Sequence, residues 1–206
     1  AGVDPENGDP LWYKNEVDAN KNPTGKRVTT NDYGSADYYY VDKSSLPKVY
    51  GGFNTSLSWK GFDLSAIFAY SIGGYIYNRD ITMILHNGSL EGRDWSTEIL
   101  KRWTPDNRYT DVPALSTTSN NWNSASTRFL QNNSYMRLKN LTLSYNLPKQ
   151  WISKLSLSSV QVYVQGDNLF TIHRNQGLDP EQGITGITYY RYPAMRTISG
   201  GINVSF

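Results

Sequence analysis

Polar and apolar positions alternate strictly along the end of the chain, from Arg196 to Phe206. One set of alternate positions is apolar or glycine: Ile198, Gly200, Ile202, Val204 and Phe206. The intervening set is polar or glycine: Thr197, Ser199, Gly201, Asn203 and Ser205. Because successive side chains of a β-strand point to opposite faces of a sheet, this pattern predicts a strand with one apolar and one polar face.

The same alternation recurs upstream and predicts five strands in all, at 49–59, 62–76, 134–147, 157–170 and 194–206. The first two are separated only by Lys60-Gly61, which predicts a β-hairpin with a tight turn. Within the third, Met136 and Leu138 alternate in the opposite phase to Leu141 and the apolar positions after it. We therefore expect a β-bulge near Lys139-Asn140.

Short and long connections alternate between these strands. The connections at 60–61 and 148–155 are short, while those at 1–48, 78–133 and 170–193 are long. Membrane β-barrels have short periplasmic turns and long extracellular loops, and each strand needs ~9 to 11 residues to cross. A soluble β-sandwich has no physical reason to sort its loops by end. The pattern therefore favours an all-β, antiparallel transmembrane β-barrel over a sandwich.

The long connections differ in their expected content. Residues 1–48 are rich in turn formers and predict an extracellular loop with little regular structure. In the second loop, 78–133, we expect one short helix near Asp94 to Trp103, capped by Asp94 or Ser96. The expected organisation is then a loop at 1–48, a hairpin at 49–77, a loop at 78–133 and the last three strands within 134–206.

Composition supports an all-β chain and excludes several kinds of site. The 206 residues include 16 Tyr, 6 Trp and 6 Phe, with 17 Gly and 9 Pro to supply turns. A net charge of +2, with basic residues scattered, gives no reason to expect a nucleic-acid partner. The absence of Cys excludes disulfides and thiolate chemistry. The start at Ala1 lacks a signal-peptide pattern, so either a signal has been removed or the chain is an internal piece of a longer protein, and we favour the second interpretation.

Five stretches together carry a family signature. They are NTSLSWKGFDLSAIFAYSIGGYIYN, EILKRWTPDNRYTDVPAL, SYMRLKNLTLSYNLPKQWI, VQVYVQGDNLFTI with GLDPE, and YYRYPAMRTISGGINVSF. In register over nearly the whole chain, they resemble the C-terminal barrel segment of SusC/RagA-type TonB-dependent outer-membrane transporters. The opening GVDPENGDPLWY also fits that family.

The resemblance implies a function and partners. Such transporters import nutrients, typically glycans or peptides, through a barrel of the 22-stranded class with a plugged lumen. The family resemblance implies a SusD-like surface lipoprotein as lid, coupling to the TonB complex through an N-terminal part, and an outer membrane of the Bacteroidetes type. It implies no enzymatic activity, no cofactor and no resident metal. Five strands cannot close such a barrel, and the plug domain is not in this sequence, so we expect a part of a transporter.

Three groups of residues are candidates for function in that setting. Aromatic residues of the expected extracellular loops could contact substrate or a lipoprotein partner, or only pack the loops together: Trp12, Tyr13, Trp95, Trp103, Trp122, Tyr189 and Tyr190. Polar strand positions are expected to face the lumen or the plug: Asn140, Gln161, Tyr163, Gln165 and Asn203. By the resemblance, the last strand would carry the signal for barrel assembly: Ile202, Val204 and Phe206.

Other chemistry is weighed against these assignments. Asp179 and Glu181 could be paired catalytic carboxylates of a glycoside hydrolase, but the resemblance favours a structural role in ordering a loop. A calcium site in the first loop, at Asp4, Glu6 and Asp9, lacks the EF-hand glycine and distal glutamate and is not expected. His86 and His173 have no partner motif. The alternative function is a secreted β-sandwich carbohydrate-binding module, which aromatic loops alone would permit.

Overall fold

The computed structural model describes residues 1–88, 90–118, 121–175, 177, 179–181, 183, 185–188 and 190–206. The chain divides into two compact units. We call Ala1–Asp42 with Asn78–Phe129 the loop unit, and Lys43–Tyr77 with Leu130–Phe206 the sheet unit. Each is described by itself.

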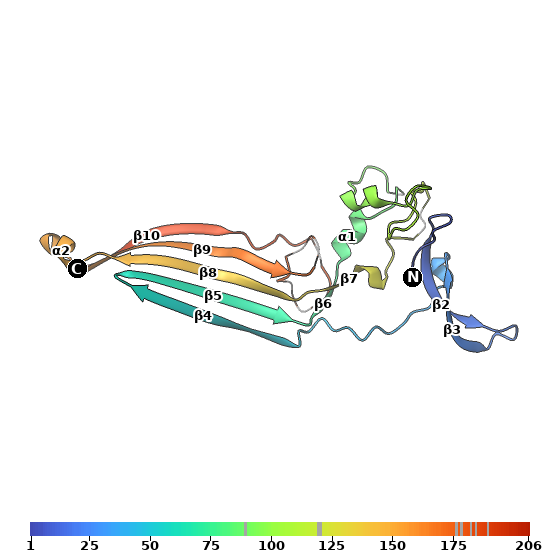
Figure 1. Cartoon of the computed structure of the whole chain (residues 1–206), viewed down its shortest axis with the longest axis horizontal. Coiled ribbons are helices and arrows are strands. Elements are labelled where there is room, and N and C mark those ends of the chain that lie inside the picture. Colours follow the sequence, from blue (N-terminus) through green and yellow to red (C-terminus); the bar gives the residue numbers. More distant parts are fainter. Residues whose placement is uncertain are drawn as a thin grey trace. The chain divides into compact units, whose positions relative to one another are not determined.

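The sheet unit is built on five antiparallel strands that lie side by side (Figure 1). In spatial order they are β10 (Thr197–Ser205), β9 (Ser159–His173), β8 (Tyr135–Asn146), β5 (Phe62–Ile72) and β4 (Val49–Trp59). All five strands predicted from alternation are therefore present. The prediction of one continuous strand over 62–76 is wrong in its last four residues, because β5 stops at Ile72 and Gly73 takes a φ of 90°. A separate short strand, β6 (Tyr75–Tyr77), follows and pairs with β7 (Leu130–Asn132).

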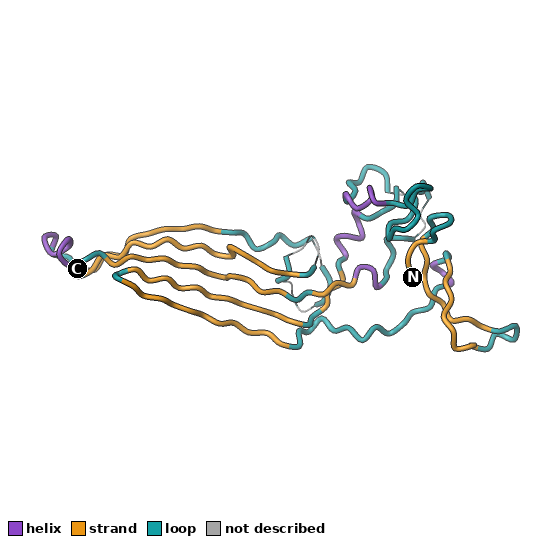
Figure 2. The backbone as a smooth tube through the Cα atoms, viewed as in Figure 1, coloured by secondary structure: helices purple, strands orange, loops and turns teal. Residues whose placement is uncertain are grey.

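The turn between β4 and β5 has the expected tight geometry. Lys60 and Gly61 both have positive φ values, 48° and 85°, and they connect a pair of strands that begins at Trp59 and Phe62. Positive φ at both central residues is what a two-residue hairpin turn needs to match the twist of its strands. The connection from β8 to β9 leaves from the same end of the sheet and holds α2 (Lys149–Ile152) and η4 (Ser153–Leu155). The long connections leave from the opposite end, as Figure 2 lets the reader follow.

The predicted bulge is present at Lys139. Neighbouring β5 pairs Ile67 with Asn140 and Phe68 with Leu138, so Lys139 is an extra residue on β8. The register between β8 and β9 shifts at the same place. Successive side chains of a strand point to opposite faces. One inserted residue therefore places Met136 and Leu138 on the same face as Leu141.

The sheet has one apolar face, and this face is exposed. Rows of laterally paired residues cross it, such as Ile202–Val162–Tyr145–Phe62–Trp59. Large apolar side chains on this face keep much of their surface open: Leu57 is 68% exposed, Ile202 65% and Val164 47%. A contiguous exposed patch of this kind marks a surface that meets lipid or another apolar partner.

The loop unit contains more regular structure than expected. The prediction of little regular structure over 1–48 is wrong, because β1 (Gly2–Val3), β2 (Pro10–Val17) and β3 (Pro23–Thr30) form an antiparallel sheet, followed by η1 (Tyr33–Ser35). The turn-forming residues at 18–22 connect β2 and β3 in a hairpin, where a long irregular loop was expected. The carboxylate of Asp18 accepts hydrogen bonds from the backbone N–H groups of Asn20 and Asn22, at 2.8 and 2.9 Å, which orders the β2–β3 connection.

The helix expected near Asp94 to Trp103 is shorter and of a different type. The structure has a 3₁₀ helix, η2 (Thr97–Lys101), capped by Ser96, whose hydroxyl accepts from the N–H of Glu98 at 3.3 Å. An α-helix that was not expected, α1 (Arg79–Ile84), precedes it, and η3 (Thr127–Phe129) follows. The buried core of this unit is formed by Leu85, Ile99, Val112, Trp122 and Phe129.

Across the described parts of the chain, no helix combines the length and the apolar character needed to span a membrane.

Candidate functional site

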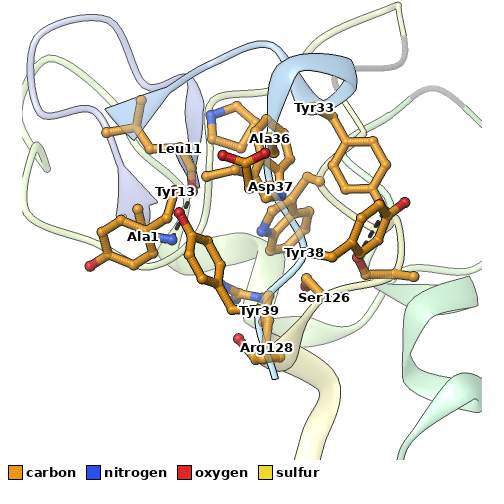
Figure 3. Close-up of a pocket in the computed structure, with 16 residues that line it drawn as sticks. Ala1, Leu11, Tyr13, Tyr33, Ala36, Asp37, Tyr38, Tyr39, Ser126 and Arg128 are labelled. Carbon is orange, nitrogen blue, oxygen red and sulfur yellow. Dashed lines mark hydrogen bonds between the residues drawn. The ribbon is translucent and has the colours of Figure 1, made fainter. Parts of the chain in front are cut away.

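A cavity of about 390 Å³ opens in the loop unit, and its walls come from four segments, the first of which is Ala1 with Gly2. Strand β2 contributes Leu11, Trp12 and Tyr13. The segment after β3 contributes Tyr33 and 36–39, and residues 125–128 with Trp122 close the remaining side. Figure 3 shows Tyr13, Tyr39 and Arg128 along one side of the cavity and Tyr33 and Tyr38 along another. The volume lies within the ~300–1,000 Å³ typical of small-ligand clefts.

The inner aromatic rings are held in fixed positions. Trp12 and Tyr33 meet edge to face, with ring centroids 5.3 Å apart and an interplanar angle of 70°. The hydroxyl of Tyr33 donates to the carbonyl of Ala125 at 2.8 Å, which ties η1 to the segment before η3. Trp122 is only 4% exposed, and the Arg128 guanidinium lies over its ring at 4.7 Å. These contacts preorganise the apolar part of the cavity.

The cavity also carries charged groups. The carboxylate of Asp37 accepts a hydrogen bond from the backbone N–H of Asn15 at 2.6 Å, so one of its oxygens is used to join two segments of the wall. The Arg128 guanidinium donates through Nη1 to the carbonyl of Asp111 at 2.7 Å. Desolvation lowers the pKa of Arg128, while Asp111 and Glu98 raise it, and the group stays cationic at neutral pH.

The cavity brings together three of the aromatic residues expected to contact substrate or a partner: Trp12, Tyr13 and Trp122. Others lie elsewhere. Trp95 donates from its indole nitrogen to Nδ1 of the buried His86 at 3.0 Å, and Tyr190 is 70% exposed in the last long loop. Tyr189 lies outside the described residues. The contact roles of these residues stay predictions.

Trp103 has a packing role in the loop unit. Its indole nitrogen donates to the carbonyl of Pro5 at 3.1 Å. Gly8 lies against its ring so closely that a Cβ there would be 2.7 Å from the Trp103 side chain. The ring of Trp103 therefore joins the first turn of the chain to the segment after η2, and its contact role stays a prediction.

Sequence reasoning missed Tyr33, Tyr39 and Arg128 as wall residues of the cavity. The run Tyr38-Tyr39-Tyr40 is visible in the sequence, but only the fold shows that Tyr38 and Tyr39 line the cavity while Tyr40 does not and is 93% exposed. Arg128 carries no sequence signal, because its position over Trp122 depends on the turn formed by η3.

The polar face of the sheet carries the residues expected to face the lumen or the plug. At the end near the short turns, side-chain hydrogen bonds cross all five strands. Asn203 donates to Gln161 at 3.2 Å, and Gln161 donates to Asn146 at 3.1 Å. Asn146 donates to Asp63 at 2.7 Å, and Asp63 also accepts from the hydroxyl of Ser58 at 2.5 Å.

Further along the same face, Asp167 is a second acceptor. Its carboxylate accepts from Asn140 at 2.7 Å and from Gln165 at 3.2 Å. Tyr163 extends over Gly201, where a Cβ would lie 2.7 Å from the tyrosine hydroxyl. The five residues thus share one polar face, and their contact with a lumen or plug stays a prediction.

The residues expected to carry an assembly signal lie on β10 or just beyond it. Ile202 and Val204 belong to the exposed apolar face, and Phe206 is 92% exposed. Their role in assembly is a prediction that the structure does not test.

The carboxylates of the GLDPE stretch are engaged in ion pairs. Asp179 lies 2.5 Å from Nη2 of Arg137, and Glu181 lies 2.8 Å from Nη1 of Arg137 and 2.6 Å from Nζ of Lys139. The Arg137 and Asp179 side chains are only 4% and 6% exposed. Burial raises the pKa of Asp179, but hydrogen bonds from the N–H of Glu181, from Arg137 and from the N–H of Ala194 outweigh it and hold this pKa below 3.8. A carboxylate held ionised in this way is a structural anchor and has no proton to donate as a general acid.

Asp4, Asp9 and His173 have hydrogen-bond partners among the described residues. Within that described part of the chain, no group of three or more His, Cys, Asp or Glu side chains converges in a way that could hold a metal ion. Asp4 accepts from the N–H of Glu6 at 2.9 Å within the first turn, and Asp9 accepts from the side chain of Asn31 at 2.9 Å, which joins that turn to the residue after β3. His173 pairs through Nδ1 with the carbonyl of Asn175 at 2.9 Å.

Comparison with known proteins places the chain. No family model matches it. TonB-dependent receptor P3 of Formosa agariphila is 34% identical over 166 residues, 75% of this chain and 16% of that receptor. TonB-dependent receptor SusC of Bacteroides thetaiotaomicron is 27% identical over 198 residues, 94% of this chain and 19% of the receptor. A solved structure of the RagAB peptide transporter matches all of this chain and 22% of its own, with 36% identity and a TM-score of 0.83.

The chain is a segment of a SusC/RagA-type TonB-dependent receptor. It spans less than a fifth of the length of the curated relatives. The five-stranded sheet of this SusC/RagA-type segment is part of an all-β, antiparallel barrel, and the match to RagAB extends through the loop unit as well. The similarity does not favour the β-sandwich module, because a transporter chain accounts for every part of this sequence.

Proposed function

We propose that this segment forms part of a TonB-dependent nutrient importer of the outer membrane, of the kind found in Bacteroidetes. The observation that carries the proposal is the match of the whole chain to the RagAB peptide transporter at 36% identity. The two faces of the sheet support it independently. An exposed apolar face fits lipid, and a polar face with a hydrogen-bond chain across all strands fits the inside of a barrel.

The cargo that we propose is peptide, because the structural relative with this identity is described as a peptide transporter. Glycan import is the alternative. A SusD-like surface lipoprotein is the proposed partner, by analogy with the RagAB assembly, and TonB coupling through a part outside this segment is the proposed source of energy. We propose no enzymatic role and no cofactor, and the ion pairs of Asp179 and Glu181 support that view.

A growth assay tests the proposal. The gene for the complete protein would be deleted in its native host, and growth measured with defined peptides or defined glycans as the limiting nutrient. We expect slow growth on peptides, restored by the complete protein but not by a form lacking its TonB-contacting segment. Normal growth on peptides and slow growth on one class of glycan would replace the peptide proposal with glycan import. Equal rescue by the form without the TonB-contacting segment would overturn TonB-driven import.

A further inference from the structure

The loop-unit cavity combines a fixed apolar wall with the guanidinium of Arg128. Among the described residues that line it, Arg128 is the cationic side chain and Asp37 the acidic one. One oxygen of Asp37 is taken by the N–H of Asn15, which makes it a part of the wall. The Arg128 guanidinium has five donors, and its contact with the Asp111 carbonyl uses Nη1. An anionic group entering the cavity therefore meets a planar donor suited to a carboxylate.

The inner aromatic rings of the cavity are arranged for an apolar side chain more than for a sugar, whereas Tyr13 and Tyr38, which also line it, are exposed. Stacking of a sugar on an aromatic residue needs an open ring face. Trp122 is buried under Arg128, and the guanidinium of Arg27 lies 4.1 Å from the centroid of the Tyr39 ring. Trp12 and Tyr33 are engaged with each other edge to face. The inner rings thus present mainly edges and partly covered faces, which pack well against aliphatic or aromatic side chains.

We propose that this cavity binds the C-terminal residue of a short peptide, with its α-carboxylate on Arg128 and its apolar side chain against Trp12 and Tyr33. The proposal rests on the proposed function and adds a specificity to it. Recognition of the free carboxylate would select short peptides over internal segments of longer proteins, because only the C-terminal residue of a chain carries an α-carboxylate together with its side chain. An acidic sugar could also present a carboxylate to Arg128, and the experiment below separates the two.

The test uses the complete protein purified in detergent, with its lipoprotein partner bound where the two copurify. Binding of a short synthetic peptide ending in Leu is measured by calorimetry, alongside the same peptide with a C-terminal amide. A charge-assisted hydrogen bond of this type predicts that amidation weakens binding about tenfold or more. A second pair of ligands, a peptide ending in Gly and a galacturonate disaccharide, reports on the side chain and on acidic sugars.

Two variants locate the effect. Arg128→Gln removes the charge at the cavity and should bind acid and amide peptides equally. Arg108→Gln is the matched control, because Arg108 is an exposed residue of the same unit that does not line the cavity. It should keep the preference for the acid.

Equal binding of acid and amide by the unaltered protein would overturn the proposal, whether or not either variant folds. A retained preference in Arg128→Gln would also overturn it. Tighter binding of the disaccharide than of any peptide would replace the peptide end by an acidic sugar. If the host takes up peptides but the protein shows no preference for a free carboxylate, only this binding site is refuted and the importer function stands. If the deletion strain grows normally on peptides in the growth assay, the proposed peptide import itself is refuted.

Discussion

The ion-pair network of Arg137 should hold the last long loop against the sheet. Arg137 projects from β8 and donates to Asp179 and Glu181 through separate nitrogens, while its Nε donates to the hydroxyl of Thr171 on β9 at 3.0 Å. Asp179 in turn accepts from the backbone N–H groups of Glu181 and Ala194 at 2.8 and 2.7 Å. One buried pair therefore fixes both residues 179–181 and the approach to β10.

Replacing Arg137 with methionine should release this loop. The change leaves the Asp179 carboxylate buried without its cation, and breaking a buried pair in this way costs about 3–5 kcal/mol. The amides of Glu181 and Ala194 report the effect directly, because both donate to Asp179. Their hydrogen exchange should accelerate roughly 100- to 4,000-fold, at one factor of ten per 1.4 kcal/mol.

Lys139→Met is the matched control. Within the described part of the chain Lys139 pairs with Glu181 alone, and both side chains are about one-third exposed, at 32% and 36%. Screening by solvent limits such a pair to about 0–1 kcal/mol, so exchange at Ala194 should change less than about fivefold. Similar acceleration in the two variants, or no acceleration in Arg137→Met, would refute the assignment of Arg137 as the anchor.

The same network predicts a pH dependence. Because the pKa of Asp179 in the folded protein lies below 3.8, its ionised form stabilises the folded loop at every pH above that value. The stabilisation should be lost only as pH falls through the lowered pKa. Protection of the Ala194 amide, corrected for intrinsic exchange, should therefore stay constant from about pH 5 to 7 and fall below about pH 4. A loss of protection between pH 5 and 7 would contradict this assignment.

Two further predictions concern the sheet and the loop unit. Val164→Arg, on the apolar face near the middle of β9, should destabilise the membrane-embedded protein by about 2–4 kcal/mol, whereas Gln165→Arg on the polar face should destabilise it little. Urea titration of the complete protein in lipid vesicles measures the free energy of unfolding of both variants. Equal losses would refute the assignment of one lipid-facing and one polar face. Gly8→Ala should destabilise the loop unit more than Gly25→Ala, because both glycines have a φ of 80° but only Gly8 lies against Trp103. The rate of proteolysis within the loop unit compares the two variants. Equal rates would show that the contact between Gly8 and Trp103 does not stabilise the unit.

Much of the sheet follows from the sequence because its determinants are local. The alternation of β4 and β5, the Lys60-Gly61 turn and the change of phase at Lys139 are all visible within short windows. The 3₁₀ character of η2 and the presence of α1 were not predicted, since both depend on packing inside the loop unit. The β2–β3 hairpin was missed because its polar, turn-rich sequence pairs through backbone hydrogen bonds and an Asp18 turn rather than through an apolar stripe.

The candidate site was less predictable than the sheet. The sequence drew attention to Trp12 and Trp122, but residues so far apart in the chain meet only through the fold. The ion pair of Asp179 with Arg137 was also not predictable from the sequence. A pair of acidic residues near the end of a loop looks like a catalytic pair until Arg137, 42 residues away, is found between the two carboxylates.

The most direct test of the barrel wall is a cysteine scan of β8, from Tyr135 to Asn146, in the complete protein reconstituted into lipid. Within these 206 residues no native cysteine competes with the introduced ones. A spin label at each position reports contact with lipid through its accessibility to oxygen. We predict high accessibility at 136 and 138 and again at 141, 143 and 145, with the alternation changing phase at Lys139. Unbroken alternation through Lys139, or no alternation at all, would contradict the account of this sheet as a two-faced membrane wall.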